Sequence, residues 1–202
     1  MRSRAAAATL SSAGFKEAYS LQGGIHAWKG LVAEGAPESG MAYFSSATKP
    51  EELIVLAWLL EDGSRKFSSE LAAEIKDQDT KNLFKDLVVA EERHQVTLLK
   101  LYQELSGLTS TSGFLGSVIS LEKKGDVMEG GLRLSEVLAW TKGKSVVEIL
   151  ELSVSSETNA YDLYVKMERQ MKDQRSARVF YVLSGEEKQH LERLSSLLER
   201  KI

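Results

Sequence analysis

The sequence predicts a mainly α protein, in which a four-helix bundle with one long crossover follows a small α/β fragment. Three observations support this fold class. The two prolines, Pro37 and Pro50, both lie in the first quarter of the 202 residues, so the rest of the chain lacks the strongest helix breaker. Apolar residues after position 50 recur every three or four positions, as they do on one face of a helix. The two halves of this region also resemble each other in sequence.

Residues 1–36 are expected to form a short α/β segment that is too small to fold alone. The pattern from Arg4 to Leu31 indicates a helix, a short strand, a turn and a second short helix. Residues 37–47 follow as a linker, because glycine, proline and serine gather where it begins. A second domain is therefore expected over residues 48–202.

The second domain is predicted to hold four long helices, at about 50–76, 79–106, 145–172 and 174–200. The first helix opens at Pro50, where proline and the acidic residues after it suit a first turn. The connection 107–144 is long, rich in Gly, Ser and Thr, and contains one weak helix. Such a connection lets the third helix begin at the end of the bundle opposite to the one where a tight turn after the second helix would place it. Gly130-Gly131 is expected to follow no strand and so to form no phosphate-binding loop.

An internal repeat relates the first two long helices to the last two. When residues 52–101 are compared with residues 148–197, 12 of 50 positions are identical, against roughly three by chance. The offset is 96 residues throughout. It pairs Glu61 with Glu157, Glu91 with Glu187, and His94 with His190.

Each predicted helix carries one apolar stripe with ionisable residues at its middle. The stripe of the second helix consists of Phe84, Leu87, Glu91, His94, Leu98, Leu101 and Leu105. The fourth helix repeats it as Phe180, Leu183, Glu187, His190, Leu194 and Leu197. The first and third helices each carry a single glutamate at mid-length, Glu61 and Glu157.

Four carboxylates facing each other in a bundle core require a positive partner. Burying one unpaired carboxylate costs several kcal/mol, and the stripes contain no lysine or arginine. Two divalent cations would balance the four negative charges, with two neutral imidazoles completing the ligand set. A single Glu-x-x-His is usually part of a solvated helix face. Two copies at the centre of apolar stripes, related by the repeat, instead favour a metal centre.

These residues resemble the rubrerythrin family of the ferritin-like superfamily over residues 48–202. The resemblance rests on the metal ligands that it implies: Glu61, Glu91, His94, Glu157, Glu187 and His190. It implies a bundle that holds two iron ions per chain, forms a homodimer and reduces hydrogen peroxide or dioxygen. The carboxylate and imidazole ligands would also accept manganese or zinc.

The sequence departs from the rubrerythrin pattern in two respects. Rubrerythrins usually carry a rubredoxin-like domain with four cysteines that feeds electrons to the iron, whereas this sequence has no cysteine. An external electron-transfer protein is therefore expected as a partner. Rubrerythrins also carry a glutamate one turn after the ligand of the third helix, where this sequence has Ala160. Tyr164 corresponds to a tyrosine that rubrerythrins place near the metals, and it is the candidate catalytic residue; a plain core role is the alternative.

Residues 1–36 resemble the C-terminal end of a rhodanese domain. The resemblance rests on Arg2-Ser3 before an alanine-rich helix and on the run Leu21-Gln22-Gly23-Gly24-Ile25. In rhodaneses the sulfur-carrying cysteine lies just before the Arg-Ser step, so no sulfurtransferase activity is expected from this chain. One alternative function is a redox-sensing bundle that regulates a fused rhodanese. A non-catalytic metal-binding or iron-handling bundle is another.

Composition excludes several further classes. The absence of cysteine excludes disulfide scaffolds, thiolate zinc sites and iron–sulfur clusters within the sequence. A net charge of −3 provides no uniformly basic surface for nucleic acid. The apolar run after Met1-Arg2 is too short for a signal peptide, and no stretch approaches 18 uncharged apolar residues. No nucleic-acid or membrane partner and a cytoplasmic location are therefore expected.

Overall fold

The computed structural model describes residues 50–107 and 126–202, together with Gly14 and Phe114. The chain divides into two units, Met1–Pro37 and Glu38–Ile202. The predicted α/β segment and the linker lie almost wholly outside the described residues. Both of them, and the resemblance of the segment to a rhodanese, therefore stay predictions. The two continuously described ranges both lie in the second unit, Glu38–Ile202.

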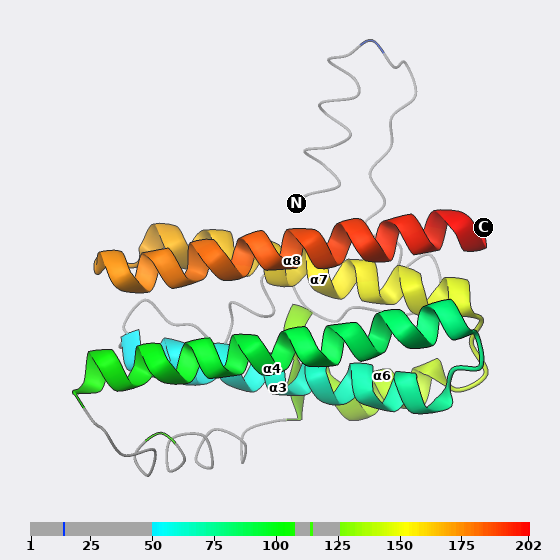
Figure 1. Ribbon diagram of the computed structural model, residues 1–202, viewed down its shortest axis with the longest axis horizontal. Coiled ribbons are helices and arrows are strands. Elements are labelled where there is room, and N and C mark those ends of the chain that lie inside the picture. Colours follow the sequence, from blue (N-terminus) through cyan, green and yellow to red (C-terminus); the bar gives the residue numbers. More distant parts are fainter. Residues whose placement is uncertain (1–13, 15–49, 108–113, 115–125) are drawn as a thin grey trace. The chain divides into compact units, whose positions relative to one another are not determined.

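Four long helices make up the body of this unit, in agreement with the prediction of a mainly α bundle. They are α3 (Pro50–Glu74), α4 (Gln78–Ser106), α7 (Val146–Gln170) and α8 (Gln174–Lys201). Their ends differ from the predicted ends by at most two residues. Figure 1 shows the four helices lying along a common direction. The fold is a ferritin-like helical bundle.

The helices form two antiparallel hairpins, α3–α4 and α7–α8, that face each other. Contacts along α4 and α8 fix their relative direction. The start of α4 meets the end of α8 through Asp77 and Lys201, 2.7 Å apart, while further along His94 meets Glu186. The two helices therefore run antiparallel. In Figure 1 α7 begins at the end of the bundle opposite to that where α4 ends, which confirms the predicted crossover.

The internal repeat is reproduced in the secondary structure. Adding 96 to the bounds of α3 gives the bounds of α7. The second helix of each helical hairpin begins with an aspartate N-cap. Asp77 accepts a hydrogen bond from Thr80 N at the start of α4, and Asp173 accepts one from Ser176 N at the start of α8. Ser145 begins α7 with a capping box, whose partner is Glu148.

The connection between the hairpins contains a small antiparallel hairpin that the sequence did not predict. Strand β1 (Val127–Met128) pairs with β2 (Leu132–Arg133) across the short 3-10 helix η2 (Glu129–Gly131). Helix α6 (Leu134–Thr141) follows and corresponds to the predicted weak helix. The expectation that Gly130-Gly131 follows no strand is wrong. Strands of two residues are too short to leave an alternating pattern, and both glycines have positive φ, as a tight turn requires.

The apolar stripes pack against one another as the core of the bundle. Large residues from all four helices, such as Leu60, Phe84, Met167 and Phe180, are completely or almost completely buried. In the parts of the chain that the structure describes, no helix has both the length and the apolar character needed to cross a membrane.

Candidate metal centre

The six predicted ligands converge at the middle of the bundle. Glu61 comes from α3, Glu91 and His94 from α4, Glu157 from α7, and Glu187 and His190 from α8. All six side chains are buried. Each sits at the centre of an apolar stripe, so the helix periodicity that forms the core also turns these side chains toward one another. Arg93 and Lys188, basic residues close to these ligands in the chain, are exposed.

The six predicted ligands form two overlapping groups of ligand atoms, each with all its atoms within 4.8 Å of one another. The first comprises Glu61, Glu91, His94 and Glu187, and the second comprises Glu91, Glu157 and His190. Glu91 belongs to both groups. Glu91 therefore connects the two groups, each of which contains one histidine.

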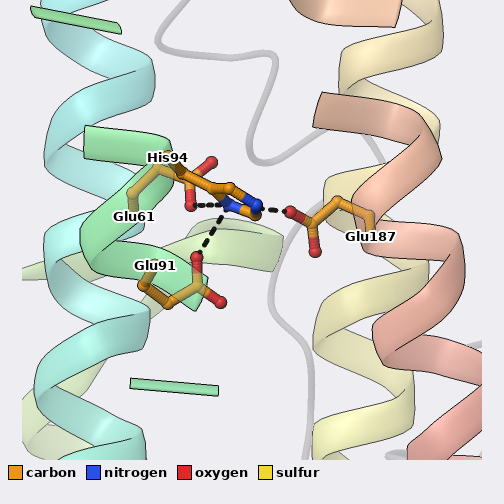
Figure 2. A group of neighbouring side chains, drawn as sticks. All are labelled: Glu61, Glu91, His94 and Glu187. Carbon is orange, nitrogen blue, oxygen red and sulfur yellow. Dashed lines mark hydrogen bonds and ion pairs between the residues drawn. The ribbon is translucent and has the colours of Figure 1, made fainter. Parts of the chain in front are cut away.

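His94 lies at the centre of the first group, as Figure 2 shows. Its Nδ1 is 2.8 Å from Glu61 Oε2, 3.0 Å from Glu91 Oε2 and 3.3 Å from Glu187 Oε1. One ring nitrogen forms at most one good hydrogen bond, so it does not satisfy three carboxylates by itself. The convergence of one nitrogen and three oxygens on one point is the donor arrangement that a cation satisfies.

His190 occupies the equivalent position in the second group. Its Nδ1 is 3.2 Å from Glu187 Oε2, 3.5 Å from Glu157 Oε2 and 3.8 Å from Glu91 Oε1. The rings of His94 and His190 are stacked, with their centroids 5.5 Å apart. The two halves of the repeat thus contribute matching donor sets on either side of the bundle centre.

Tyr164, the predicted catalytic residue, is completely buried beside the same carboxylates. Its hydroxyl donates a hydrogen bond to Glu61 Oε1 and lies 3.1 Å from Glu129 Oε1. Burial and the charge of Glu61 raise the pKa of the phenol well above 10, so Tyr164 keeps its proton. The residue therefore has a polar partner at the site rather than a purely apolar core role.

Two acidic residues of the site were missed by the sequence analysis. Glu129 enters from η2 and is completely buried next to Glu157 and Glu187. Glu186 accepts a hydrogen bond from His94 Nε2 at 2.6 Å, and its side chain is partly exposed. No helical periodicity marks Glu129. Glu186 directly precedes the predicted ligand Glu187 in the chain and resembles an ordinary surface residue. Neither Glu129 nor Glu186 therefore had a recognisable signal.

The electrostatics of the site reflect crowded negative charge. Burial and the charge of Glu61 raise the pKa of Glu91, while burial and the charge of Glu129 raise that of Glu187. Burial alone would raise the pKa of Glu61, but the charge of His94 and several hydrogen bonds lower it to about 2. Burial would lower the pKa of His94, but the charge of Glu61 and the contact with Glu186 raise it. A metal ion that bound here would therefore compete with protons for these side chains.

The residues present fit a metal ion well. Buried side-chain oxygens without a hydrogen-bond partner are rare in proteins, yet several occur together here. They are both oxygens of Glu91, Oε2 of Glu129, Oε2 of Glu157 and Oε1 of Glu187. Carboxylates with imidazole suit iron and manganese, and zinc is also compatible. The cluster therefore has the character of a metal-binding site.

Comparisons with known proteins agree with this fold. A solved structure of a hypothetical protein from Pyrococcus furiosus matches with a TM-score of 0.58 and 22% sequence identity, over 82% of this chain and 95% of that chain. This similarity supports the fold alone. No curated protein matches the sequence significantly. The Rubrerythrin family model matches residues 148–201, which contain Glu157, Glu187 and His190, and so supports assignment to the ferritin-like and rubrerythrin family.

Proposed function

We propose that this protein binds two iron ions between its helical hairpins and reduces hydrogen peroxide or dioxygen with electrons from an external donor protein. The observation that carries the proposal is the buried cluster of Glu and His side chains with unpartnered oxygens. The match of the α7–α8 region to the Rubrerythrin family model supports it. Glu61, Glu91, His94 and Glu187 would hold one ion, and Glu91, Glu157 and His190 would hold the other.

Two ferrous ions would supply the two electrons that convert hydrogen peroxide and two protons into two molecules of water. The protein contributes the surroundings of that reaction. Glu186 contacts His94 Nε2 and so orients Nδ1 toward the carboxylates. Tyr164 holds a proton on its hydroxyl oxygen beside Glu61, in a site from which the apolar stripes exclude water. An electron carrier must return the two electrons for the next turnover.

The proposal is tested by loading the purified protein with Fe²⁺ under anaerobic conditions and then adding hydrogen peroxide. We expect about two irons per chain and a rise in ferric absorbance within seconds. Glu91→Ala and His190→Ala should lose iron, because each removes a ligand. Their matched controls are Glu92→Ala and Gln189→Ala, exposed neighbours on the same helices.

The outcomes distinguish the two functional classes. Iron that binds but does not respond to peroxide or dioxygen would identify a metal-binding or iron-handling bundle instead of an oxidoreductase. Retention of two irons by both ligand variants would contradict the assignment of the site.

A further inference from the structure

Glu129 is a buried carboxylate that reaches the metal centre from outside the four long helices. It lies in η2, between the two strands of the small hairpin, and its side chain is completely buried. Oε1 lies 3.1 Å from the Tyr164 hydroxyl, whereas Oε2 has no hydrogen-bond partner. A buried, unpartnered carboxylate oxygen is costly, so its presence calls for a ligand.

The backbone of Glu129 is held in place by both hairpins. Its N–H donates to Ser64 Oγ of α3 at 3.3 Å, and its C=O accepts from Ser156 Oγ of α7 at 3.0 Å. The next residue, Gly130, turns back with a φ of 76°. These contacts fix the point at which the side chain enters the bundle.

The close packing of β1 against α3 depends on a glycine in that helix, Gly63. A Cβ on Gly63 would lie 2.1 Å from the carbonyl oxygen of Val127 and 2.7 Å from Met128 Cα. Only glycine therefore allows β1 to contact α3 this closely. The close contact of β1 with α3 and the turn at Gly130 together place the Glu129 carboxylate inside the bundle.

The side chain of Glu129 meets two of the proposed ligands there. One oxygen from each of Glu129, Glu157 and Glu187 lies within 4.8 Å of the other two. Glu157 Oε2 and Glu187 Oε1 are themselves buried without hydrogen-bond partners. Three ionised carboxylates repel one another at this separation, so either protons or a cation must neutralise them.

We infer that Glu129 is a fifth carboxylate ligand of the metal centre and binds the ion that Glu157 and His190 also hold. The inference rests on the proposed metal site but assigns a residue that comes from the crossover connection. The two ions then have unequal surroundings. In the described part of the chain, the group of ligand atoms around His94 contains no carboxylate from the crossover connection.

The test is a titration of the metal-free protein with Co²⁺, whose visible spectrum depends on the number and type of its ligands. Glu129→Gln keeps the shape of the side chain but removes the charge. Glu136→Gln is the matched control, because Glu136 lies on α6 shortly after the hairpin and is exposed. Glu187→Gln serves as the reference for loss of a helix ligand. Thermal melts of each metal-free variant report folding separately.

We expect Glu129→Gln to weaken one of two Co²⁺ binding steps at least tenfold and to change the spectrum of that ion, while the other step stays unchanged. Glu136→Gln should match the wild type. Wild-type affinity and spectrum in Glu129→Gln would overturn the inference but leave the metal site intact, whereas a wild type that binds no Co²⁺ would overturn the proposed function itself.

A second variant covers the case in which Glu129→Gln does not fold. Glu129→Asp keeps the carboxylate but withdraws it by one methylene, so it should fold and still weaken the same binding step. Unchanged Co²⁺ binding in a folded Glu129→Asp would also count against ligation by Glu129.

Discussion

His94 uses both of its ring nitrogens, and the two contacts serve different purposes. Nδ1 faces the carboxylates of the site, while Nε2 contacts Glu186 at the edge of the bundle. A histidine that binds a metal through one nitrogen is commonly oriented by a carboxylate at the other. If His94 binds a metal ion as proposed, Glu186 would orient its ring, although the Glu186 side chain is partly exposed.

We predict that Glu186→Gln weakens metal binding about 10- to 100-fold without unfolding the protein, as loss of an orienting carboxylate typically does. Competition with a chelator of known affinity measures the effect. The control is Glu192→Gln, an exposed residue of the same helix. Equal affinities for both variants would show that Glu186 does not orient His94.

Tyr164 provides a second prediction, because its hydroxyl holds a proton beside Glu61. Tyr164→Phe removes only the hydroxyl, so metal content should stay near that of the wild type. Oxidation of the ferrous protein by peroxide should slow about 100-fold or more if this group assists proton transfer. Stopped-flow absorbance measures the rate, and Tyr161→Phe on the exposed side of α7 is the control. Unchanged oxidation would leave Tyr164 with a packing role.

The sequence predicts six residues of this site because each lies on a helical stripe whose neighbours are apolar. The repeat then supplies a second copy of every signal, so Glu61 and Glu157 support each other. Glu129 has no such context: it lies in a three-residue element between two-residue strands. Its burial depends on contacts with Ser64 and Ser156, which are distant in sequence.

At the scale of elements, the small β1–η2–β2 hairpin is positioned by α3 and α7. Gly63→Ala places a methyl group against the backbone of Val127 and Met128, which cannot move aside as a flexible side chain would. We predict a loss of about 1–3 kcal/mol in the free energy of unfolding. Urea denaturation of the metal-free protein measures it.

Gly185→Ala is the matched control for that substitution. Gly185 also lies in a long helix, but a Cβ there would meet no atom within 4 Å. The change should be neutral or stabilise the protein by up to about 1 kcal/mol, because alanine favours helix more than glycine does. If both substitutions changed stability in the same direction, close approach at Gly63 would not explain the result.

Two carboxylates at the starts of helices predict how the stability of the protein depends on pH. A hydrogen bond from Lys201 and contacts with Thr80 lower the pKa of Asp77 from 3.8 to about 2, and contacts with Ser145 and Lys144 lower that of Glu148 from 4.5 to about 2. A lowered acid pKa stabilises the folded state above the unfolded-state pKa. That stabilisation is lost as the pH falls through the folded-state value.

Asp77→Asn isolates this effect, because asparagine still caps a helix but carries no charge. We expect its melting temperature to fall less steeply than that of the wild type between about pH 5 and pH 2. The exposed Glu92→Gln on the same helix should follow the wild type. An identical pH profile for Asp77→Asn and the wild type would exclude the contact with Lys201 as a source of stability.

At the scale of the whole molecule, the sequence predicts the bundle well because periodicity and repetition operate over long helices. The positions of the helix ends follow from local signals, such as the aspartate N-caps that the repeat duplicates. The hairpin in the crossover could not be predicted in the same way. Its strands are set by tertiary contact with α3 rather than by their own pattern.

The metal centre should also contribute to the stability of the entire bundle, since its proposed ligands come from all four long helices. Without metal, buried like charges must be neutralised by protons; with metal, the same groups hold the two hairpins together. Any ion that binds only the folded state stabilises it, by about 2.7 kcal/mol when free metal is 100 times the dissociation constant.

We predict a rise in melting temperature when Co²⁺ is added to the metal-free wild type and reversal by chelation. Glu91→Gln, which alters the carboxylate common to both ligand groups, should show little rise at the same Co²⁺ concentration. An equal rise in that variant would mean that the stabilising ion binds elsewhere on the protein.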